Sequence, residues 1–270
     1  MCNFKNLIIG FVILLLSFNV LSFFICPCNI SFFSFFCLNS NIFYITLILA
    51  ILIIPVVLSF FPSLEFHHKP VICRGKINEK EVALTFDDGP DPENTPVILN
   101  ILERYHLKAT FFIIGKKIIG NEDLIRQIIQ KGHKIGNHSY EHSNLWDFQS
   151  SGMLRKDIQE THDLIFEITG ATTNYFRPPY GVINPMIHNA LRNFDYLVIA
   201  WSKRSLDTIL KNDKKILRRT TKKLRPGDIL LFHDTSKTTC ILLEQIILTI
   251  QKANFEIVSL DKFINTNQYD

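Results

Sequence analysis

Hydrophobic and polar residues are distributed very differently in the two parts of the chain. Residues 6–64 contain no Asp, Glu, Lys or Arg, and two apolar runs within them, about 7–25 and 42–61, are each long enough to cross a bilayer as a helix. The Pro, Ser and Asn residues between the two runs are typical of a turn. We therefore predict an N-terminal transmembrane helical hairpin and assign residues 1–65 to a membrane anchor.

The processing of this N-terminal segment and its orientation in the membrane need separate interpretation. The first run could instead be a cleaved signal peptide, but the small-residue cleavage pattern of such peptides is missing. Basic residues flank the two runs, with Lys5 before the first and Lys69 and Arg74 after the second, and none lies between them. The positive-inside rule then places both ends of the chain on the cytoplasmic side.

After a predicted tether at 66–79, short β-rich runs alternate with longer helical runs. Strands are predicted at 81–86, 109–114, 134–136, 175–177, 196–201, 228–232 and 255–259, and helices at 96–105, 122–131, 152–168, 185–193, 213–224 and 239–252. Repeated βα units of this length indicate an α/β fold with a parallel sheet and right-handed crossovers. Seven strands are compatible with an open sheet or with a closed barrel.

The charge balance excludes one class of partner. The chain has 29 basic and 25 acidic residues, a net charge of +4, which gives no reason to expect nucleic acid. One local run, 211–228, carries eight basic residues. This run could contact an anionic membrane surface, or it could be the solvated face of a helix whose Ile216, Leu217 and Leu224 pack inward.

Polar residues with catalytic chemistry follow the predicted strands one after another. They are Asp87 and Asp88 after the first strand, His138 and His142 after the third, Arg177 and Tyr180 at the fourth, Asp207 after the fifth and His233 after the sixth. In a parallel α/β fold the carboxyl ends of the strands share one face, and functional sites form there. These side chains are therefore expected to converge.

The residue types predict a catalytic metal site. His138 and His142 are four residues apart, so a single helical turn would put both imidazoles on one side, where Asp88 completes a set of two nitrogens and one oxygen. Zinc is the expected ion, and other divalent transition metals suit the same ligands. Asp87 is then free to act as general base, and His233, oriented by Asp207, as general acid.

Five motifs carry a resemblance to a known family. They are TFDDGP at 85–90, HSYEH at 138–142, RPPYG at 177–181, WSKRSLD at 201–207 and LFHD at 231–234. In this order and spacing they resemble the motifs of polysaccharide deacetylases, carbohydrate esterase family 4, over about residues 80–235. The resemblance implies a distorted (β/α)7-type barrel with parallel strands, in which residues 80–270 form the catalytic domain.

The resemblance also implies a role for each matched residue. Asp87 is the base, Asp88, His138 and His142 are the metal ligands, Arg177 orients Asp87, Asp207 tunes the acid His233, and the Tyr180 backbone N–H stabilises the oxyanion. Pro179, Tyr180, Trp201 and Leu231 contact the substrate, with Leu231 in the acyl pocket. The implied cofactor is Zn²⁺, with Co²⁺, Mn²⁺, Ni²⁺ or Fe²⁺ as alternatives. Thr208 departs from the family pattern, because many members place there a Trp that walls the pocket.

The expected activity is a metal-dependent hydrolysis of a carbon–nitrogen bond other than a peptide bond. Attack by a metal-bound water removes an N-acyl group, such as N-acetyl, from an amino sugar of a cell-wall polysaccharide or oligosaccharide. One alternative substrate is a lipid-linked saccharide with a formamido or acetamido group. An alternative of another class is an inactive carbohydrate-binding membrane protein. The expected location is the bacterial inner membrane, crossed twice, with membrane lipid as a partner and the catalytic domain on the cytoplasmic side.

Overall fold

The computed structural model describes residues 44–49 and 71–264, and the chain divides into two compact units, Met1–Leu64 and Glu65–Asp270. In the first unit residues 44–49 are helical. The rest of the two predicted membrane spans, about 7–25 and 42–61, lies outside the described residues. Within the described ranges, no helix combines the length and the apolar character that crossing a bilayer requires.

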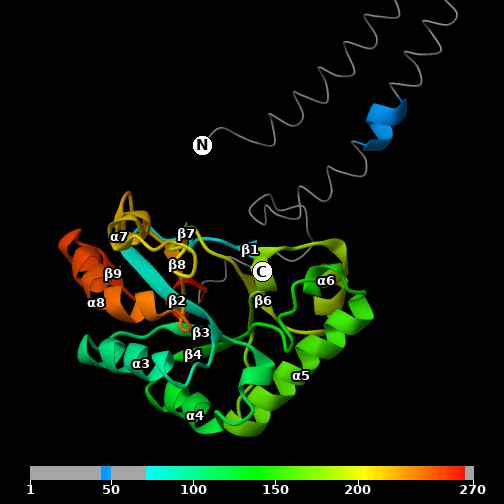
Figure 1. Cartoon of the computed structure of the whole chain (residues 1–270), viewed down its shortest axis with the longest axis horizontal. Helices are drawn as coiled ribbons and strands as arrows, with labels where there is room; N and C mark the ends of the chain where they lie inside the picture. Colours follow the sequence, from blue (N-terminus) through cyan, green and yellow to red (C-terminus); the bar gives the residue numbers. More distant parts are fainter. Residues whose placement is uncertain (1–43, 50–70, 265–270) are drawn as a thin grey trace, which may run out of the picture. The chain divides into compact units, whose positions relative to one another are not determined.

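The second unit is built on a parallel sheet (Figure 1). Its strands are β1 (Val71–Ile72), β2 (Glu81–Gly89), β3 (Thr110–Ile113), β4 (Lys134–Asn137), β5 (Tyr175–Phe176), β6 (Leu197–Ile199), β7 (Lys203–Arg204), β8 (Asp228–His233) and β9 (Glu256–Ile257). The order is β1-β6-β5-β4-β3-β2-β8-β7, and β9 pairs with β2. The parallel α/β fold predicted from the alternation is confirmed. β1 and β7, which were not predicted, have only two residues each.

The sheet curls without closing into a complete barrel. Its end strands, β1 and β7, are not hydrogen-bonded to one another in the described part of the chain. Just after β1, Arg74 forms an isolated antiparallel bridge with Asp228 at the start of β8, and its Nη2 lies 2.6 Å from the buried carboxylate. This ion pair links the segment after β1 to the start of β8, at a place where no continuous strand pairing of the described residues joins the two sides of the curved sheet. Residues 71–74 of the predicted tether therefore belong to the folded unit.

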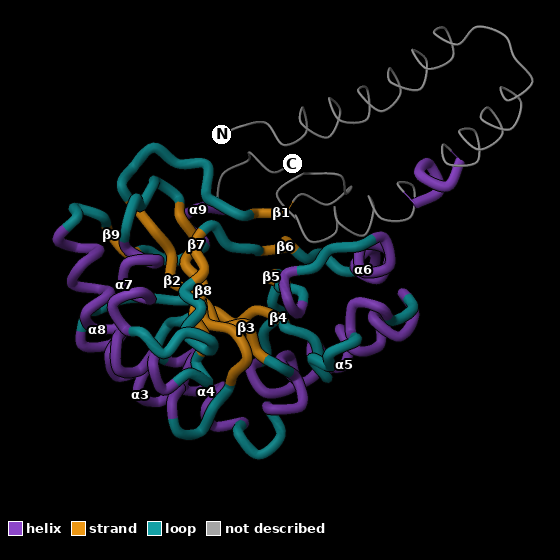
Figure 2. Tube along the Cα trace, turned by 45° about the horizontal axis from the view of Figure 1, so that its top comes forward, coloured by secondary structure: helices purple, strands orange, loops and turns teal. Residues whose placement is uncertain are grey.

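Helices cover the outside of the curl (Figures 1 and 2). They are α3 (Asn94–Arg104), α4 (Glu122–Gln130), α5 (Ser151–Thr169), α6 (Pro185–Ala190), α7 (Asp213–Thr221), α8 (Lys237–Lys252) and α9 (Asp261–Ile264), with short 3₁₀ turns η2 (Gly115–Lys117), η3 (Trp146–Phe148), η4 (Pro179–Gly181) and η5 (Leu191–Asn193). Asn184 caps α6 by accepting hydrogen bonds from Met186 N and Ile187 N, which fixes where that helix begins.

Alternation along the central strands separates the packed core from the site. On β2, Val82, Leu84 and Phe86 belong to the core cluster that packs under the helices. The intervening positions face the inside of the curl, where Ala83 joins a second apolar cluster. On β8 the same period puts Leu230 and Phe232 in the outer core. Asp87 and His233 therefore reach the inner side at the carboxyl ends of neighbouring strands.

Replacing Gly89 by alanine is expected to destabilise this unit by about 1–3 kcal/mol, because overpacking forces buried groups to move. A Cβ at Gly89 would lie 2.0 Å from Oδ2 of the buried Asp234. Thermal unfolding followed by tryptophan fluorescence measures the effect, since both tryptophans, Trp146 and Trp201, belong to this unit. Gly152→Ala is the matched control, because its new Cβ meets nothing within 4 Å. Equal unfolding temperatures for the two variants would contradict the prediction.

Candidate active site

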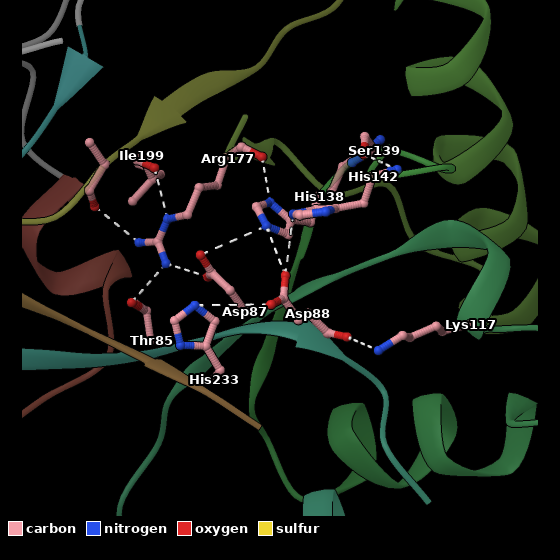
Figure 3. A network of polar contacts seen from close by, with 12 residues as sticks. Thr85, Asp87, Asp88, Lys117, His138, Ser139, His142, Arg177, Ile199 and His233 are labelled. Atoms are coloured by element: carbon pink, nitrogen blue, oxygen red, sulfur yellow. Dashed lines mark hydrogen bonds and ion pairs between the residues drawn. The ribbon is translucent and has the colours of Figure 1, made fainter. Parts of the chain in front are cut away.

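A bulge at the end of β2 brings two adjacent carboxylates to one place. Asp87 pairs with Phe112 of β3 and Gly89 with Ile113, so Asp88 is an extra residue without a partner in the ladder. Its φ of 73° is in the left-handed region. On a regular strand, neighbouring side chains leave on opposite faces; a bulge re-aims them. Lys117 Nζ donates to the Asp88 carbonyl oxygen at 2.8 Å and holds the bulged turn (Figure 3).

The buried side chain of Arg177 holds the carboxylate of Asp87 in position. The guanidinium is fully buried, and its Nη1 lies 2.5 Å from Asp87 Oδ1, while its carbon lies 4.0 Å from the centre of the Phe112 ring. Its other hydrogen bonds go to Thr85 Oγ1 at 2.9 Å and to the carbonyl oxygens of Ile199 and Ala200, each at 3.0 Å. Because Oδ1 is occupied in this way, Oδ2 is the oxygen of Asp87 that remains for chemistry in the pocket.

His138 and His142 lie on a loop after β4, and the predicted helical turn is wrong. The loop has positive φ angles of 68° at Ser139 and 47° at His142, which no helix permits. Ser139 Oγ accepts from the His142 N–H at 3.2 Å, and the carboxylate of Asp157 on α5 accepts from the two N–H groups between them, each at 2.9 Å. These bonds, rather than a helical turn, set the separation of the two histidines.

The two histidines and Asp88 have the separations of a metal site. Asp88 Oδ1 lies 3.4 Å from His138 Nε2 and 3.4 Å from His142 Nε2. Ligand atoms held tetrahedrally at ~2.0–2.1 Å from zinc lie about 3.3–3.4 Å apart. The carbonyl oxygen of Arg177 lies 2.7 Å from His138 Nδ1 and can only accept, so Nδ1 carries the proton and Nε2 presents its lone pair. The residues fit a divalent cation.

The electrostatic surroundings favour the protonation states in which Asp88 and His142 can bind a metal. Burial acts to raise the pKa of Asp88, but the neighbouring imidazoles of His138, His142 and His233 outweigh it and hold the pKa well below its usual range. Burial and the neighbouring His138 lower the pKa of His142 to about 4. Near neutral pH, Asp88 is therefore an anion and His142 a neutral imidazole, which are the forms that bind a metal.

His233 lies on β8, beside Asp87 at the bulged end of β2, and is oriented by Asp207. Asp207 accepts from the His233 backbone N–H and lies 2.8 Å from His233 Nδ1, which leaves Nε2 facing the site, 4.0 Å from Asp88 Oδ2. Ser205 and Thr239 both donate to the Asp207 carboxylate. Burial works against the charged imidazolium, but the hydrogen bond and the negative charge of Asp207 outweigh it, and the pKa of His233 is raised.

A cavity of about 160 Å³ lies above these groups. Sites that enclose a whole ligand measure ~300–1,000 Å³, so this cavity suits one group of a larger molecule. It is lined by Asp87, Asp88, His138, His142, Pro178, Tyr180, Gly181, Trp201, Arg204, Thr208, Leu231 and His233.

Three of the four predicted substrate contacts line this cavity, namely Tyr180, Trp201 and Leu231. The fourth, Pro179, is buried at the start of η4 and is not among the lining residues, and Pro178 lines the wall in its place. Tyr180 has φ of 58° and donates from its hydroxyl to Asn144 at 3.2 Å. Arg177 and Asp207 lie behind the wall, where they contact Asp87 and His233.

Backbone strain is concentrated around the cavity. Of the eight non-glycine residues with positive φ in the described part of the chain, five lie around the cavity, namely Asp88, Ser139, His142, Tyr180 and Leu206, the last beside Asp207; His106, Lys223 and Asn254 are the other three. Such conformations cost about 1–3 kcal/mol each and persist only where the surroundings enforce them. Their clustering here indicates that the fold holds this geometry at the expense of stability.

Several supporting residues were missed in the sequence. Asp157 organises the histidine loop, Lys117 holds the Asp88 turn, and Ser205 and Thr239 hold Asp207. Asp157, Lys117 and Thr239 belong to helices or turns of other βα units, and their positions in the sequence show no regular spacing that would point to the site. Ser205 alone lies inside a quoted motif, two residues before Asp207, where its hydroxyl could have been read as a local partner.

Comparison with known proteins gives consistent matches. The family model described as polysaccharide deacetylase matches residues 74–199. A peptidoglycan-N-acetylglucosamine deacetylase of Bacillus cereus is 34% identical over 193 residues, which is 69% of this chain and 89% of that protein. The Listeria monocytogenes peptidoglycan-N-acetylglucosamine deacetylase PgdA is 33% identical over 72% of this chain but only 40% of its own length. The chain thus spans less than half of this longer relative.

Solved structures agree with the sequence matches. The Bc1960 peptidoglycan N-acetylglucosamine deacetylase has a TM-score of 0.70 and 30% identity over 77% of this chain and 98% of that one. A carbohydrate esterase family 4 pseudoenzyme from Bacillus anthracis has a TM-score of 0.67 and 28% identity over 72% of this chain and 69% of its own. Together with the curled parallel sheet and the Asp–His–His cluster at its carboxyl edge, these matches show that the chain belongs to the polysaccharide deacetylase family.

Proposed function

We propose that the chain is a metal-dependent hydrolase that removes the N-acetyl group from an amino sugar of a cell-wall polysaccharide. The observation that carries the proposal is the convergence of Asp88, His138 and His142 within 4.8 Å of one another, flanked by Asp87 and His233. Relatives named as peptidoglycan-N-acetylglucosamine deacetylases support the substrate class. The proposed metal is Zn²⁺, with Co²⁺, Mn²⁺, Ni²⁺ and Fe²⁺ as alternatives.

In this proposal Asp87 takes the proton from the attacking water. Arg177 holds Oδ1 at 2.5 Å, so Oδ2 is presented to the cavity, 3.9 Å from His138 Nε2. Asp88 and the two histidines would hold a divalent cation, which would supply Lewis acidity for the amide carbonyl and for the attacking water. A carboxylate fixed on one side by a buried guanidinium meets the positional requirement of a general base.

His233 delivers the proton that the leaving amine needs. Its Nδ1 is held by Asp207, so Nε2 is the nitrogen that faces the cavity. An amine leaves an amide carbon only when it is protonated, which is why an acid opposite the base is required. The Tyr180 backbone N–H is proposed to stabilise the oxyanion, and Leu231 to contact the acyl group, because both residues line the same cavity.

Family membership alone does not decide between an enzyme and an inactive binding protein, since one structural relative is named a pseudoenzyme. The residues of this chain favour an enzyme. A binding module needs neither a proton acceptor nor a proton donor at the reacting bond. Asp87 and His233 are both present, and each has a buried partner that orients it.

The membrane anchor remains part of the proposal. Residues 6–64 contain no charged side chain, and two runs of 19 and 20 residues within them suit membrane-spanning helices. The basic flanks favour the cytoplasmic side of a bacterial inner membrane, where the substrate would be a lipid-linked saccharide, whereas action on the finished wall polymer requires the catalytic unit on the opposite side. A protease-protection assay on membrane vesicles tests this orientation, and cleavage of the unit from the opposite side would contradict it.

Removing divalent metal is expected to abolish amine release by the full-length protein. The assay measures free amine and acetate from N-acetylglucosamine oligomers and from peptidoglycan fragments before and after chelation. Adding back Zn²⁺, Co²⁺, Mn²⁺, Ni²⁺ or Fe²⁺ separately identifies the ion that restores the rate. An undiminished rate in protein shown to be free of metal would overturn the proposal, and acyl release from none of these saccharides would overturn the substrate class.

A further inference from the structure

Arg204 lies on the wall of the catalytic cavity. It belongs to β7, where it pairs in register with Leu231 of β8. Partners in a parallel ladder point to the same face of the sheet, and so do residues two apart on one strand. Arg204 therefore shares its face with Leu231 and His233, and all three line the cavity. Its guanidinium carbon is 5.6 Å from the centre of the Trp201 ring, a cation–π contact that keeps the charge at the wall.

The charge of Arg204 is not neutralised by the described part of the protein. Of the two carboxylates lining the cavity, Asp87 is paired with Arg177, and Asp88 faces the two metal-ligand histidines. Among residues 44–49 and 71–264, no ion pair involves Arg204, and its side chain is exposed. The cavity therefore has a cation on its wall that is available to a bound molecule.

The surroundings of Arg204 increase the positive potential. Between residues 203 and 225 there are ten basic residues and only two acidic ones, and one of these, Asp207, is buried against His233. Arg219 Nε donates to the Arg204 carbonyl oxygen at 3.3 Å, which brings a second guanidinium close. Crowded like charges oppose folding through repulsion and attract anions to the region.

We infer that Arg204 is a specificity-determining residue that binds an anionic group, a carboxylate or a phosphate, on the saccharide whose acyl group is removed. The inference rests on the proposed function and narrows its substrate to negatively charged amino sugars. A guanidinium binds both oxyanions through paired N–H donors. A saccharide that enters the cavity can place such a group against the wall. A flat bilayer cannot enter a cavity, so a membrane would contact the outward-facing charges of α7 instead.

The test compares three substrates of the full-length protein. They are a neutral N-acetylglucosamine oligomer, a peptidoglycan glycan strand bearing carboxylates, and a lipid-linked saccharide bearing phosphate. Arg204→Gln is expected to lower kcat/KM for an anionic substrate, relative to the neutral one, about ten- to hundredfold, the range of one charge-assisted hydrogen bond. The loss should fall mainly on KM, because Arg204 contacts the saccharide away from the bond that breaks. The two anionic substrates distinguish the carboxylate from the phosphate.

Two variants serve as controls. Arg204→Lys keeps the charge and should retain part of the preference, and Arg192→Gln removes an exposed arginine of η5 that does not line the cavity, so it should change nothing. Isothermal titration calorimetry with the same saccharides gives the ratios of affinity independently of turnover. A wild-type protein without preference for the anion, or a preference that Arg204→Gln leaves intact, overturns the inference. Absence of acyl release with intact anion-dependent binding overturns the proposed function instead.

Discussion

Asp88→Ala and His142→Ala are expected to lose the metal, whereas Asp87→Asn is expected to keep the metal and lose turnover. Asp88 Oδ1 lies 3.4 Å from both histidine nitrogens, so removing it or His142 leaves two ligands. Mutating a residue that hydrogen-bonds to a metal ligand already lowers metal affinity 10–100-fold, so removing a ligand itself should lower the affinity by more than ~100-fold. In Asp87→Asn the amide oxygen can still accept from Arg177, but the side chain cannot take a proton, and kcat should fall by about 10²–10⁴-fold.

These variants are measured for metal content by mass spectrometry and for amine release in the full-length protein. Asp195→Asn is a matched control, because Asp195 is an exposed aspartate outside the cavity. It should retain both metal and activity. Equal metal content in Asp88→Ala, His142→Ala and Asp87→Asn would contradict the division of labour between the two adjacent carboxylates.

The elements that could be predicted are those with a long periodic pattern. All seven predicted strands and all six predicted helices have counterparts, because each buries a side that the sequence marks with regularly spaced apolar residues. β5 and β9 are equally short but lie within predicted β-rich runs, whereas β1 lies in the predicted tether and β7 consists of the charged pair Lys203–Arg204, so neither is marked by such a run. The predicted tether was too long for a related reason. Val71–Ile72 pair with β6 through backbone hydrogen bonds, and such pairing leaves no pattern in the sequence.

Within the site, residue types could be predicted but not the backbone that presents them. Asp87, Asp88, His138, His142 and His233 are recognisable because they follow successive strands. The bulge at Asp88 and the loop between the histidines were not foreseen, since each depends on a hydrogen bond with a distant residue: Lys117 donates to the bulge, and Asp157 accepts from the loop. The roles assigned to the gathered side chains remain predictions.

Arg204 illustrates a different limit. The quoted motif WSKRSLD contains it, yet nothing in that string distinguishes it from Lys203 beside it. Only the register with Leu231 places Arg204 on the cavity wall, whereas Lys203 donates to the carbonyl oxygen of Lys222. The eight basic residues of 211–228 are compatible with a membrane contact or with a solvated helix face. The structure adds that Arg219 of α7 donates to the carbonyl oxygen of Arg204, so α7 lies beside the strand that carries this cavity residue.

His233→Ala is expected to retain metal and saccharide binding while kcat falls by about 10²–10⁴-fold, the contribution of a positioned general acid. Its Nε2 lies 4.0 Å from Asp88 Oδ2, on the opposite side of the cavity from the ligand histidines, so its removal leaves the metal ligands in place. Metal content, titration calorimetry with N-acetylglucosamine oligomers and amine release separate the three properties. Normal turnover in His233→Ala would remove the proposed acid from the mechanism.

The pH dependence supplies an independent check on His233. An acid must be protonated to act, so the rate should fall as pH rises through the pKa of His233, which Asp207 raises against the opposing effect of burial. Asp207→Asn removes the negative charge while an amide oxygen can still accept from His233, and the pKa of His233 then falls. The descending limb of kcat/KM should accordingly move to lower pH in Asp207→Asn. A limb that stays in place, or moves to higher pH, would show that another group gives up the proton.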